Sequence, residues 1–233
     1  MFYGKKKAIT FSYDDAVEQD IRLIEILDKY GLKATFNLNS GYLGMPGELI
    51  REGVKIRHDK IAPEKIREVY KNHEVAVHTL THPFLPTVAD ENEIIRQVQE
   101  DRIALSELCG YEVVGFAYPG GGVNFDRRVA DLIRTRTGVK YARTTVCTHS
   151  FDLPADLYEF TPSIFHNGDW NDFMAFVERF LGMDTDRKQV LYVWGHAYEF
   201  DVRDTWGRFE EFLQTVSRRK DVLYATNKEA LLS

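Results

Sequence analysis

Short apolar runs alternate with longer amphipathic stretches along the chain. Seven runs rich in β-branched and aromatic residues predict buried strands. These runs lie at 8–11, 34–36, 75–77, 113–116, 139–142, 190–194 and 222–225. The stretches between them carry apolar residues at helical spacing and predict helices. The predicted helices lie at 21–30, 63–72, 90–108, 126–136, 171–181, 205–218 and 227–233.

Buried strands that alternate with helices indicate parallel βαβ units. This number of units suits either a barrel or a doubly wound open sheet. Residues 40–60 and 144–168 read as irregular, because Gly, Pro and Asp interrupt them. No internal repeat or linker divides the chain, so we expect an α/β protein with a single domain over residues 1–233.

The charge balance limits the partners of this chain. Among its 233 residues, Lys and Arg number 30 and Asp and Glu number 36, for a net charge of −6. This balance argues against nucleic-acid and membrane partners, which need a basic face. No apolar run is long enough to span a membrane, and the N-terminus lacks the order of a signal peptide. We therefore expect a cytoplasmic protein in which Cys109 and Cys147 are reduced thiols.

Most of the polar residues that suggest chemistry come directly after a predicted strand. They are Asp14 and Asp15, His78 and His82, Tyr118 with Gly120–Gly122, Arg143, and His196. In a parallel α/β fold, the carboxyl ends of all strands open on the same face. The sequence therefore predicts that these residues converge on one site.

The pair His78 and His82 has a spacing that can bring two imidazoles to one metal ion. The intervening residues lack the Glu of the H-E-x-x-H motif, so this is not a zinc-protease helix. One carboxylate of the Asp14-Asp15 pair can complete a site of two histidines and one aspartate, and the other can act as a base. Two structural histidines and an aspartate helix cap are the alternative reading.

Two further features have both a chemical and a structural interpretation. His196 is a candidate general acid, or a strand-end histidine satisfied by a backbone carbonyl. The Gly120–Gly122 run reads as a simple turn when taken alone. It lacks the spacing of a nucleotide-binding loop, and the chain contains neither a P-loop nor a G-x-S-x-G elbow.

Taken together, these motifs resemble the polysaccharide deacetylase family, the chitooligosaccharide deacetylase homology group of carbohydrate esterases (family 4). The family's T-F-D-D-G motif resembles Thr10–Ala16, and its H-[ST]-x-x-H motif is intact at His78–His82. Its F-R-P-P-Y-G motif resembles Phe116–Gly121, and its late leucine–histidine motif resembles Leu191–His196. The motifs occur in the family's order and cover nearly the whole chain.

The resemblance implies a distorted (β/α) barrel of about seven parallel strands. It also implies a divalent metal, usually zinc, held by Asp15, His78 and His82. Asp14 would be the general base and His196 the general acid, and a backbone N–H near Gly120 would stabilise the oxyanion. Histidine and aspartate donors suit zinc, although cobalt, nickel or manganese can occupy the same geometry.

The chain departs from the family pattern at several positions. Ser12 and Tyr13 separate Phe11 from the aspartate pair, and Ala16 replaces the glycine. Ala117 replaces the arginine that pairs with the base in the family, and we expect Arg143 to supply that cation. Asp169-Trp170 looks similar to the family's fourth motif, but its spacing does not support the match.

The resemblance predicts hydrolysis of an N-acetyl or similar acyl group on an amino sugar or glycan. The alternatives are a metal-dependent hydrolase of a non-sugar amide or ureide, and a non-catalytic carbohydrate-binding relative. The candidate residues for contacting a small-molecule or oligosaccharide substrate are Tyr118, Gly120, Asn39, Trp194 and His166. The sequence makes no prediction of oligomeric state.

Overall fold

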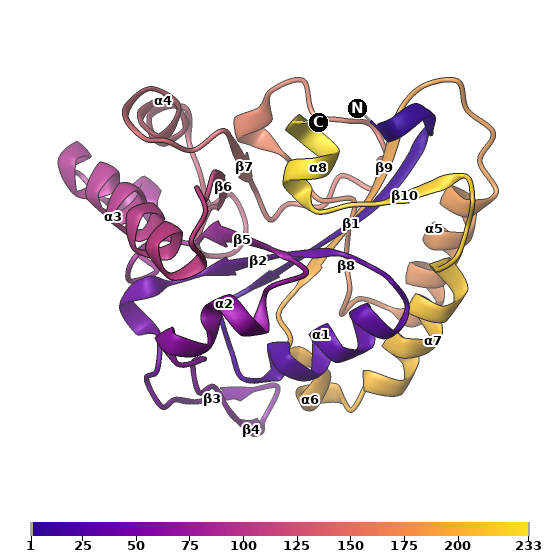
Figure 1. The fold of residues 1–233 in the computed structure, drawn as a ribbon, viewed down its shortest axis with the longest axis horizontal. Helices are drawn as coiled ribbons and strands as arrows, with labels where there is room; N and C mark the ends of the chain where they lie inside the picture. The colour runs from indigo at the N-terminus through magenta and orange to yellow at the C-terminus, as the bar shows by residue number, and fades with distance from the viewer. Residues whose placement is uncertain (1, 233) are drawn as a thin grey trace.

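The main sheet curls into the distorted barrel that the family resemblance implied. The computed structural model describes residues 2–232 and places the strands in the order β7-β6-β5-β2-β1-β9-β8, with β10 also paired to β1 (Figure 1). All pairings in this sheet are parallel. Its strands are β1 (Lys7–Asp14), β2 (Ala34–Leu38), β5 (Glu74–Val77), β6 (Gly115–Ala117), β7 (Tyr141–Arg143), β8 (Ile164–Phe165), β9 (Gln189–Gly195) and β10 (Val222–Tyr224).

Strand β1 lies at the centre of the fold. It pairs with β9 along nearly its whole length, with β10 over its first residues and with β2 over its last. Every residue of β1 is buried, as expected for a strand of a parallel sheet that is covered on both faces. The last residue of this strand is Asp14, so the most firmly held strand delivers the first candidate catalytic side chain.

A single bridge connects the two ends of the strand order. Arg143 at the end of β7 pairs in parallel with Phe160, and the N–H of Thr144 donates to the Phe160 carbonyl at 3.0 Å. A few residues later the same segment pairs with β9, where the N–H of Ser163 donates to the carbonyl of Tyr192 at 2.9 Å. The segment between β7 and β8 therefore closes the ring with far fewer hydrogen bonds than a full strand would provide.

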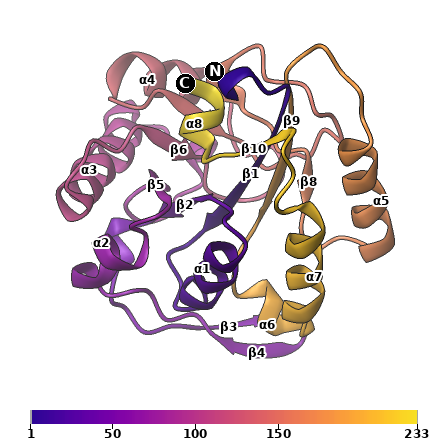
Figure 2. The same ribbon diagram turned by 45° about the vertical axis from the view of Figure 1, so that its right-hand side comes forward.

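Helices surround the sheet, with α3 and α4 on one side and α5 and α7 on the other (Figure 2). The helices are α1 (Gln19–Lys29), α2 (Ile66–Val69), α3 (Glu91–Cys109), α4 (Arg127–Arg136), α5 (Trp170–Leu181), α6 (Glu199–Arg203), α7 (Trp206–Val216) and α8 (Asn227–Leu232). Short 3-10 helices occupy Phe2–Gly4, Ser40–Tyr42, Pro63–Lys65, Leu85–Thr87 and Leu157–Glu159. None of the helices within residues 2–232 has the length and apolar character needed to cross a membrane.

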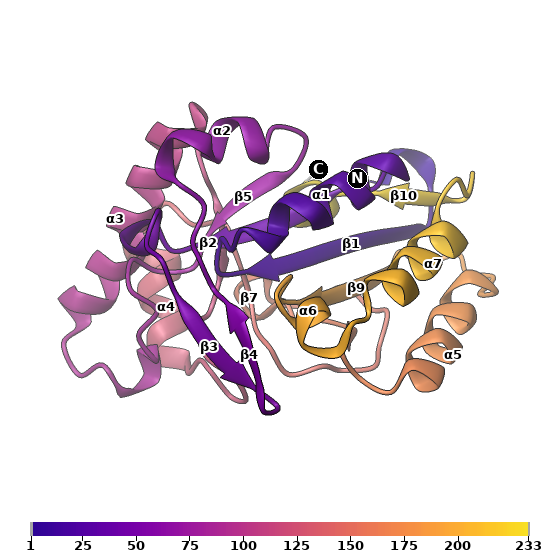
Figure 3. The ribbon, with the colours of Figure 1, turned by 90° about the horizontal axis from the view of Figure 1, so that it is seen from below.

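The predicted strands and helices are confirmed, and 144–168 is largely irregular as expected apart from β8 and the 3-10 helix Leu157–Glu159, but the expectation that 40–60 is irregular is wrong. Strands β3 (Glu48–Arg51) and β4 (Val54–Arg57) form an antiparallel hairpin that stands apart from the barrel (Figure 3). Its residues are mostly exposed, so they lack the alternation of a half-buried strand. Strand β8 and helix α6 are too short to produce a periodic signal.

Candidate active site

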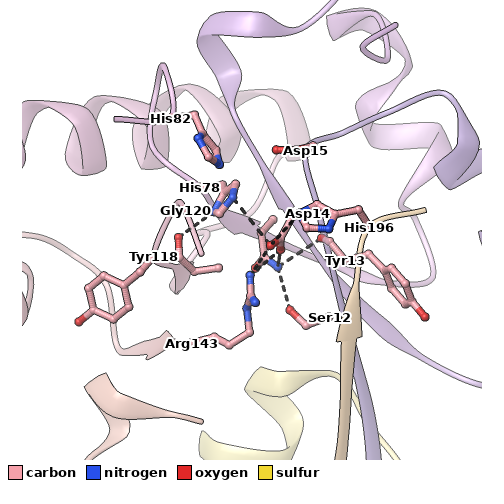
Figure 4. A network of polar contacts seen from close by, with 12 residues as sticks. Ser12, Tyr13, Asp14, Asp15, His78, His82, Tyr118, Gly120, Arg143 and His196 are labelled. Atoms are coloured by element: carbon pink, nitrogen blue, oxygen red, sulfur yellow. Dashed lines mark hydrogen bonds and ion pairs between the residues drawn. The ribbon is translucent and has the colours of Figure 1, made fainter. Parts of the chain in front are cut away.

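The carboxyl ends of β1, β5, β7 and β9 bring distant parts of the chain to one place. They supply Asp14, His78, Arg143 and His196, each of which lies at the end of its strand or directly after it. Figure 4 shows these side chains grouped around Asp14, with His82 and Asp15 beside them. The convergence expected from a parallel sheet is therefore present.

Asp15, His78 and His82 form a cluster suited to a metal ion. One ligand atom from each lies within 4.8 Å of the others. Nδ1 of His78 lies 2.8 Å from the carbonyl oxygen of Ala117, which can only accept, so Nδ1 carries the proton and the Nε2 lone pair is free. Two imidazoles and one carboxylate leave positions open for water and substrate, and this donor set fits zinc.

The turn that carries the two histidines adopts unusual backbone conformations. Thr79 and His82 have φ of 68° and 54°, in the left-handed region that non-glycine residues rarely adopt. The side-chain amide of Asn39 donates to the carbonyls of His78 and Thr79 at 2.5 and 2.9 Å. The carboxylate of Asp101 accepts the N–H of His78 at 3.1 Å. These buried contacts hold a strained turn in the position that the cluster requires.

Asn39 was predicted to contact substrate, but its placement favours the support of this turn. The residue is 1% exposed, and both hydrogen bonds described for its side chain go to the backbone of the neighbouring loop. A side chain so enclosed does not reach a ligand without displacing the histidine turn. The sequence showed only a polar residue after a strand, and this signal does not distinguish the two roles.

Asp14 is buried and held by two donors. Nη2 of Arg143 lies 2.6 and 2.5 Å from its two oxygens, and Nδ2 of Asn37 donates to Oδ1 at 2.7 Å. Burial alone would raise the pKa of Asp14, but the charge of Arg143, with smaller contributions from His78 and His196, outweighs burial and lowers the pKa. Arg143 therefore occupies the position expected of the cation that Ala117 cannot provide, and Asp14 is kept as a carboxylate that can accept a proton.

His196 also faces the carboxylate of Asp14. Its Nε2 lies 3.9 Å from Oδ2 of Asp14, as does Nε2 of His78. Burial would lower the pKa of His196, but the carboxylate of Glu199, helped by those of Asp15 and Asp14, outweighs burial and raises the pKa to about 9. By contrast, burial lowers the pKa of His78 to about 4. One histidine is thus suited to donate a proton at neutral pH, and the other to offer a lone pair.

Glu199 is a residue of the site that the sequence reasoning missed. Its Oε2 accepts the backbone N–H of His196 at 2.9 Å and lies 3.4 Å from Nδ1 of that ring. The same oxygen accepts Nε2–H of His166 at 2.7 Å. The only signal in the sequence was a glutamate three positions after His196. This spacing indicates a contact only when helix α6 directs the Glu199 side chain toward His196.

His166 and Tyr118 were predicted to contact substrate, but both side chains are buried. His166 donates to Glu199, and its ring packs so closely on Gly195 that a Cβ there would lie 2.2 Å from Nε2. The Tyr118 hydroxyl donates to the carbonyl of Tyr158 at 3.0 Å, and its ring points away from the site in Figure 4. Both placements favour support of the site over contact with a ligand.

Gly120 and Trp194 lie closer to the reacting groups. Gly120 has a φ of +87°, and a Cβ at this position would lie 2.8 Å from the ring of Phe84, so glycine is needed for both reasons. The Arg143 guanidinium lies 4.9 Å from the centre of the Trp194 ring. Trp194 thus packs against the arginine that holds Asp14, and its contact with substrate stays a prediction.

Asp169-Trp170, which looked similar to the family's fourth motif, begins helix α5. The carboxylate of Asp169 accepts the N–H groups of Asn171 and Asp172 at 2.9 and 3.0 Å, as an N-cap does. The carboxylate that lies beside Nδ1 of His196 belongs to Glu199.

Comparison with known proteins agrees with the fold described above. The chain is similar to peptidoglycan deacetylase PdaC from Bacillus subtilis, with 17% identity, a TM-score of 0.57, and 97% of this chain and 90% of that one covered. It is similar to a family 4 carbohydrate esterase from Streptomyces lividans, with 15% identity, a TM-score of 0.58, and 95% and 93% covered. Against BC0361, a polysaccharide deacetylase from Bacillus cereus, identity is 18% and the TM-score 0.50. That match covers 64% of this chain and only 44% of BC0361.

Because each sequence identity is low, these structural likenesses establish the fold and nothing more. The sequence itself matches the family described as polysaccharide deacetylase over residues 3–142, which is more than half of the chain. This match includes Asp14, Asp15, His78 and His82. The chain therefore belongs to the polysaccharide deacetylase family.

Proposed function

We propose that this chain is a metal-dependent hydrolase that removes an N-acetyl group from an amino sugar or glycan. The observation that carries the proposal is the cluster of Asp15, His78 and His82 beside a separate carboxylate, Asp14, that a buried arginine keeps ionised. A ligand set and a spare base within one site are the parts that amide hydrolysis needs.

The chain's own residues divide the proton transfers between them. Asp14 accepts a proton from the attacking water while the water oxygen bonds to the acyl carbon. The N–H of Gly120 donates to the oxygen that gains charge. His196 then gives the proton on Nε2 to the nitrogen, and the carbon–nitrogen bond breaks to leave acetate and a free amine. A divalent cation at the cluster would supply Lewis acidity to the carbonyl and lower the pKa of water.

The family and the site both support the proposed class of substrate. Two of the similar structures are described as a peptidoglycan deacetylase and a carbohydrate esterase, which supports an N-acetylated glycan or glycan fragment. Zinc is the cation we propose, because two imidazoles and one carboxylate are a preferred set for it. Hydrolysis of a non-sugar amide and binding without turnover remain outcomes that the experiment separates.

The proposal is tested with zinc-loaded protein and a panel of N-acetylated amino sugars, chitooligosaccharides and non-sugar acetamides, with release of acetate and amine as the readout. We expect turnover on sugar substrates. Asp14→Asn should keep stoichiometric zinc and lose turnover by ~10²-fold or more, the usual scale for a lost general base. His82→Ala should lose zinc itself, and His149→Ala, an exposed histidine, is the matched control.

Each contrary result has a distinct meaning. Undiminished turnover by Asp14→Asn would remove the assigned base. Turnover confined to non-sugar acetamides would replace the proposed substrate class. Zinc binding with no turnover on any member of the panel would favour a carbohydrate-binding relative over an enzyme.

A further inference from the structure

The segment that follows the β3–β4 hairpin packs directly against the segment that carries Asp15. The N–H of Glu18 donates to the carbonyl of Asp59 at 2.9 Å, and the N–H of Ile61 donates to that of Ala16 at 2.9 Å. Asp15 and Ala16 have φ of 87° and 54°, both in the left-handed region. The pairing therefore holds an unfavourable turn in place, and it brings the first residue after β4, His58, to the candidate ligand.

The His58 side chain points at the carboxylate of Asp15. Its Nε2 lies 3.4 Å from Oδ2, and the two side chains are 20% and 13% exposed. This nitrogen is buried and makes no hydrogen bond with good geometry within residues 2–232. Lys60 is also close, but its Nζ donates to the backbone carbonyl of Asp15 and not to the carboxylate. Of the side chains described, His58 is thus the one positioned to donate to this carboxylate.

The ring of His58 is held from its other side by an aromatic contact. Its centre lies 5.1 Å from that of Tyr198, with the two planes at 76°. The Tyr198 ring in turn lies 5.0 Å from that of His196. The backbone of His58 is fixed as well, because its N–H donates to the carbonyl of Gly47 at 2.7 Å. A side chain fixed at both ends is suited to orient a neighbour.

His58 is not a fourth member of the metal cluster in this arrangement. The group whose donor atoms lie within 4.8 Å of one another contains Asp15, His78 and His82, and His58 falls outside it. A cation at that cluster needs one oxygen of Asp15, and a cation that takes Oδ1 leaves Oδ2, the oxygen that lies 3.4 Å from Nε2 of His58, for a hydrogen bond. Ligating carboxylates in metal sites are commonly hydrogen-bonded by a residue of this kind, and its loss weakens metal binding.

We propose that His58 is a positioning residue for Asp15: its Nε2–H donates to Oδ2 and reserves the other carboxylate oxygen for the metal ion. This inference rests on the proposed metal dependence. It also gives the hairpin a role, since β4 delivers the histidine to the site. The effect of His58 on activity is then indirect, through the orientation and affinity of a ligand.

The test is the dissociation constant of zinc, measured by competition with a chromophoric chelator on the full chain. His58→Phe keeps a ring against Tyr198 and removes the donor, and it should weaken zinc binding by roughly 10–100-fold. His58→Gln restores an N–H donor and should recover most of the lost affinity. His149→Ala, at an exposed position, should bind zinc as the unaltered chain does. Circular dichroism of each metal-free variant checks that it is folded.

Cobalt provides a second readout that separates positioning from direct ligation. The ligand set fixes the visible absorption of bound Co²⁺, so His58→Phe should leave its band positions unchanged if His58 is outside that set. Altered bands would make His58 a ligand and overturn the proposal, as would zinc affinity equal to that of the unaltered chain. Equal affinity leaves the metal site itself intact, whereas absence of zinc binding by the unaltered chain overturns both the inference and the metal dependence.

Discussion

Arg143 donates from Nη2 to both oxygens of Asp14, although 129 positions of sequence separate the two residues. Arg143 is fully buried and Asp14 is 2% exposed, so both charges have left water. A buried charge is tolerated only when it is paired and hydrogen-bonded. The ion pair therefore connects the stability of the fold with the ionisation of the candidate base.

Replacing Arg143 with Met should leave an uncompensated carboxylate in the interior. We expect the metal-free protein to lose about 3–5 kcal/mol of unfolding free energy at neutral pH, the usual cost of breaking a buried pair from one side. The pKa of Asp14 should rise, because burial then acts without the opposing charge. Urea unfolding at neutral pH measures the first effect, and titration of the Asp14 carboxyl by NMR measures the second.

The double variant Arg143→Met with Asp14→Asn supplies the control. It removes both charges, so it should be more stable than Arg143→Met alone, and the double-mutant cycle gives the coupling between the two residues. Simple additivity of the two single changes would show that the pair contributes nothing specific. Asp131→Asn with Arg134→Met is a matched exposed pair, for which a coupling of only ~0.2–1 kcal/mol is expected.

The sequence was sufficient to place Arg143 because the argument depended only on strand ends. A parallel sheet brings its carboxyl ends together regardless of the details of packing. Asp14, His78 and His196 converge for the same reason. Residue type and position relative to a strand are properties that a sequence shows directly.

The sequence was not sufficient where side-chain direction decides the role. Tyr118 and Asn39 both follow strands, yet one points into the core and the other is occupied by a neighbouring loop. Glu199 and His58 lie on segments without a periodic signal, namely a five-residue helix and the end of an exposed hairpin. Their contacts with His196 and Asp15 depend on tertiary packing that a local pattern does not contain.

Replacing Glu199 with Gln should lower the pKa of His196 in the metal-free protein. That pKa is raised to about 9 despite burial, with the charge of Glu199 as the largest opposing cause. Without that charge, burial should bring the pKa back toward or below its ordinary value of about 6.5. NMR titration of the His196 ring protons measures the shift, and Glu211→Gln, at an exposed position, is the control.

The same change should alter how stability depends on pH. A histidine whose pKa is higher in the folded state than in the unfolded state stabilises the fold fully below the unfolded pKa, and this contribution is lost as pH rises through the folded pKa. The metal-free protein should therefore lose stability between about pH 6.5 and pH 9. Glu199→Gln should flatten the loss in this window. An unchanged slope in urea unfolding across these pH values would refute the assignment of the shift to Glu199.

Two adjacent glycines provide a matched test of the loop that would hold the oxyanion. At Gly120 a Cβ meets the Phe84 ring at 2.8 Å and φ is +87°, whereas at Gly121 a Cβ meets nothing within 4 Å. Gly120→Ala should cost about 1–3 kcal/mol of unfolding free energy and reduce turnover, because the residue must adopt a strained conformation or move its N–H. Gly121→Ala should be neutral or stabilise by up to about 1 kcal/mol through the unfolded state.

Adding Phe84→Ala to Gly120→Ala should relieve the contact but not the backbone strain, so only part of the stability should return. Equal stability of the two single variants in urea unfolding would mean that the backbone at Gly120 is free to relax, and a fixed N–H at that position could not then be part of the site.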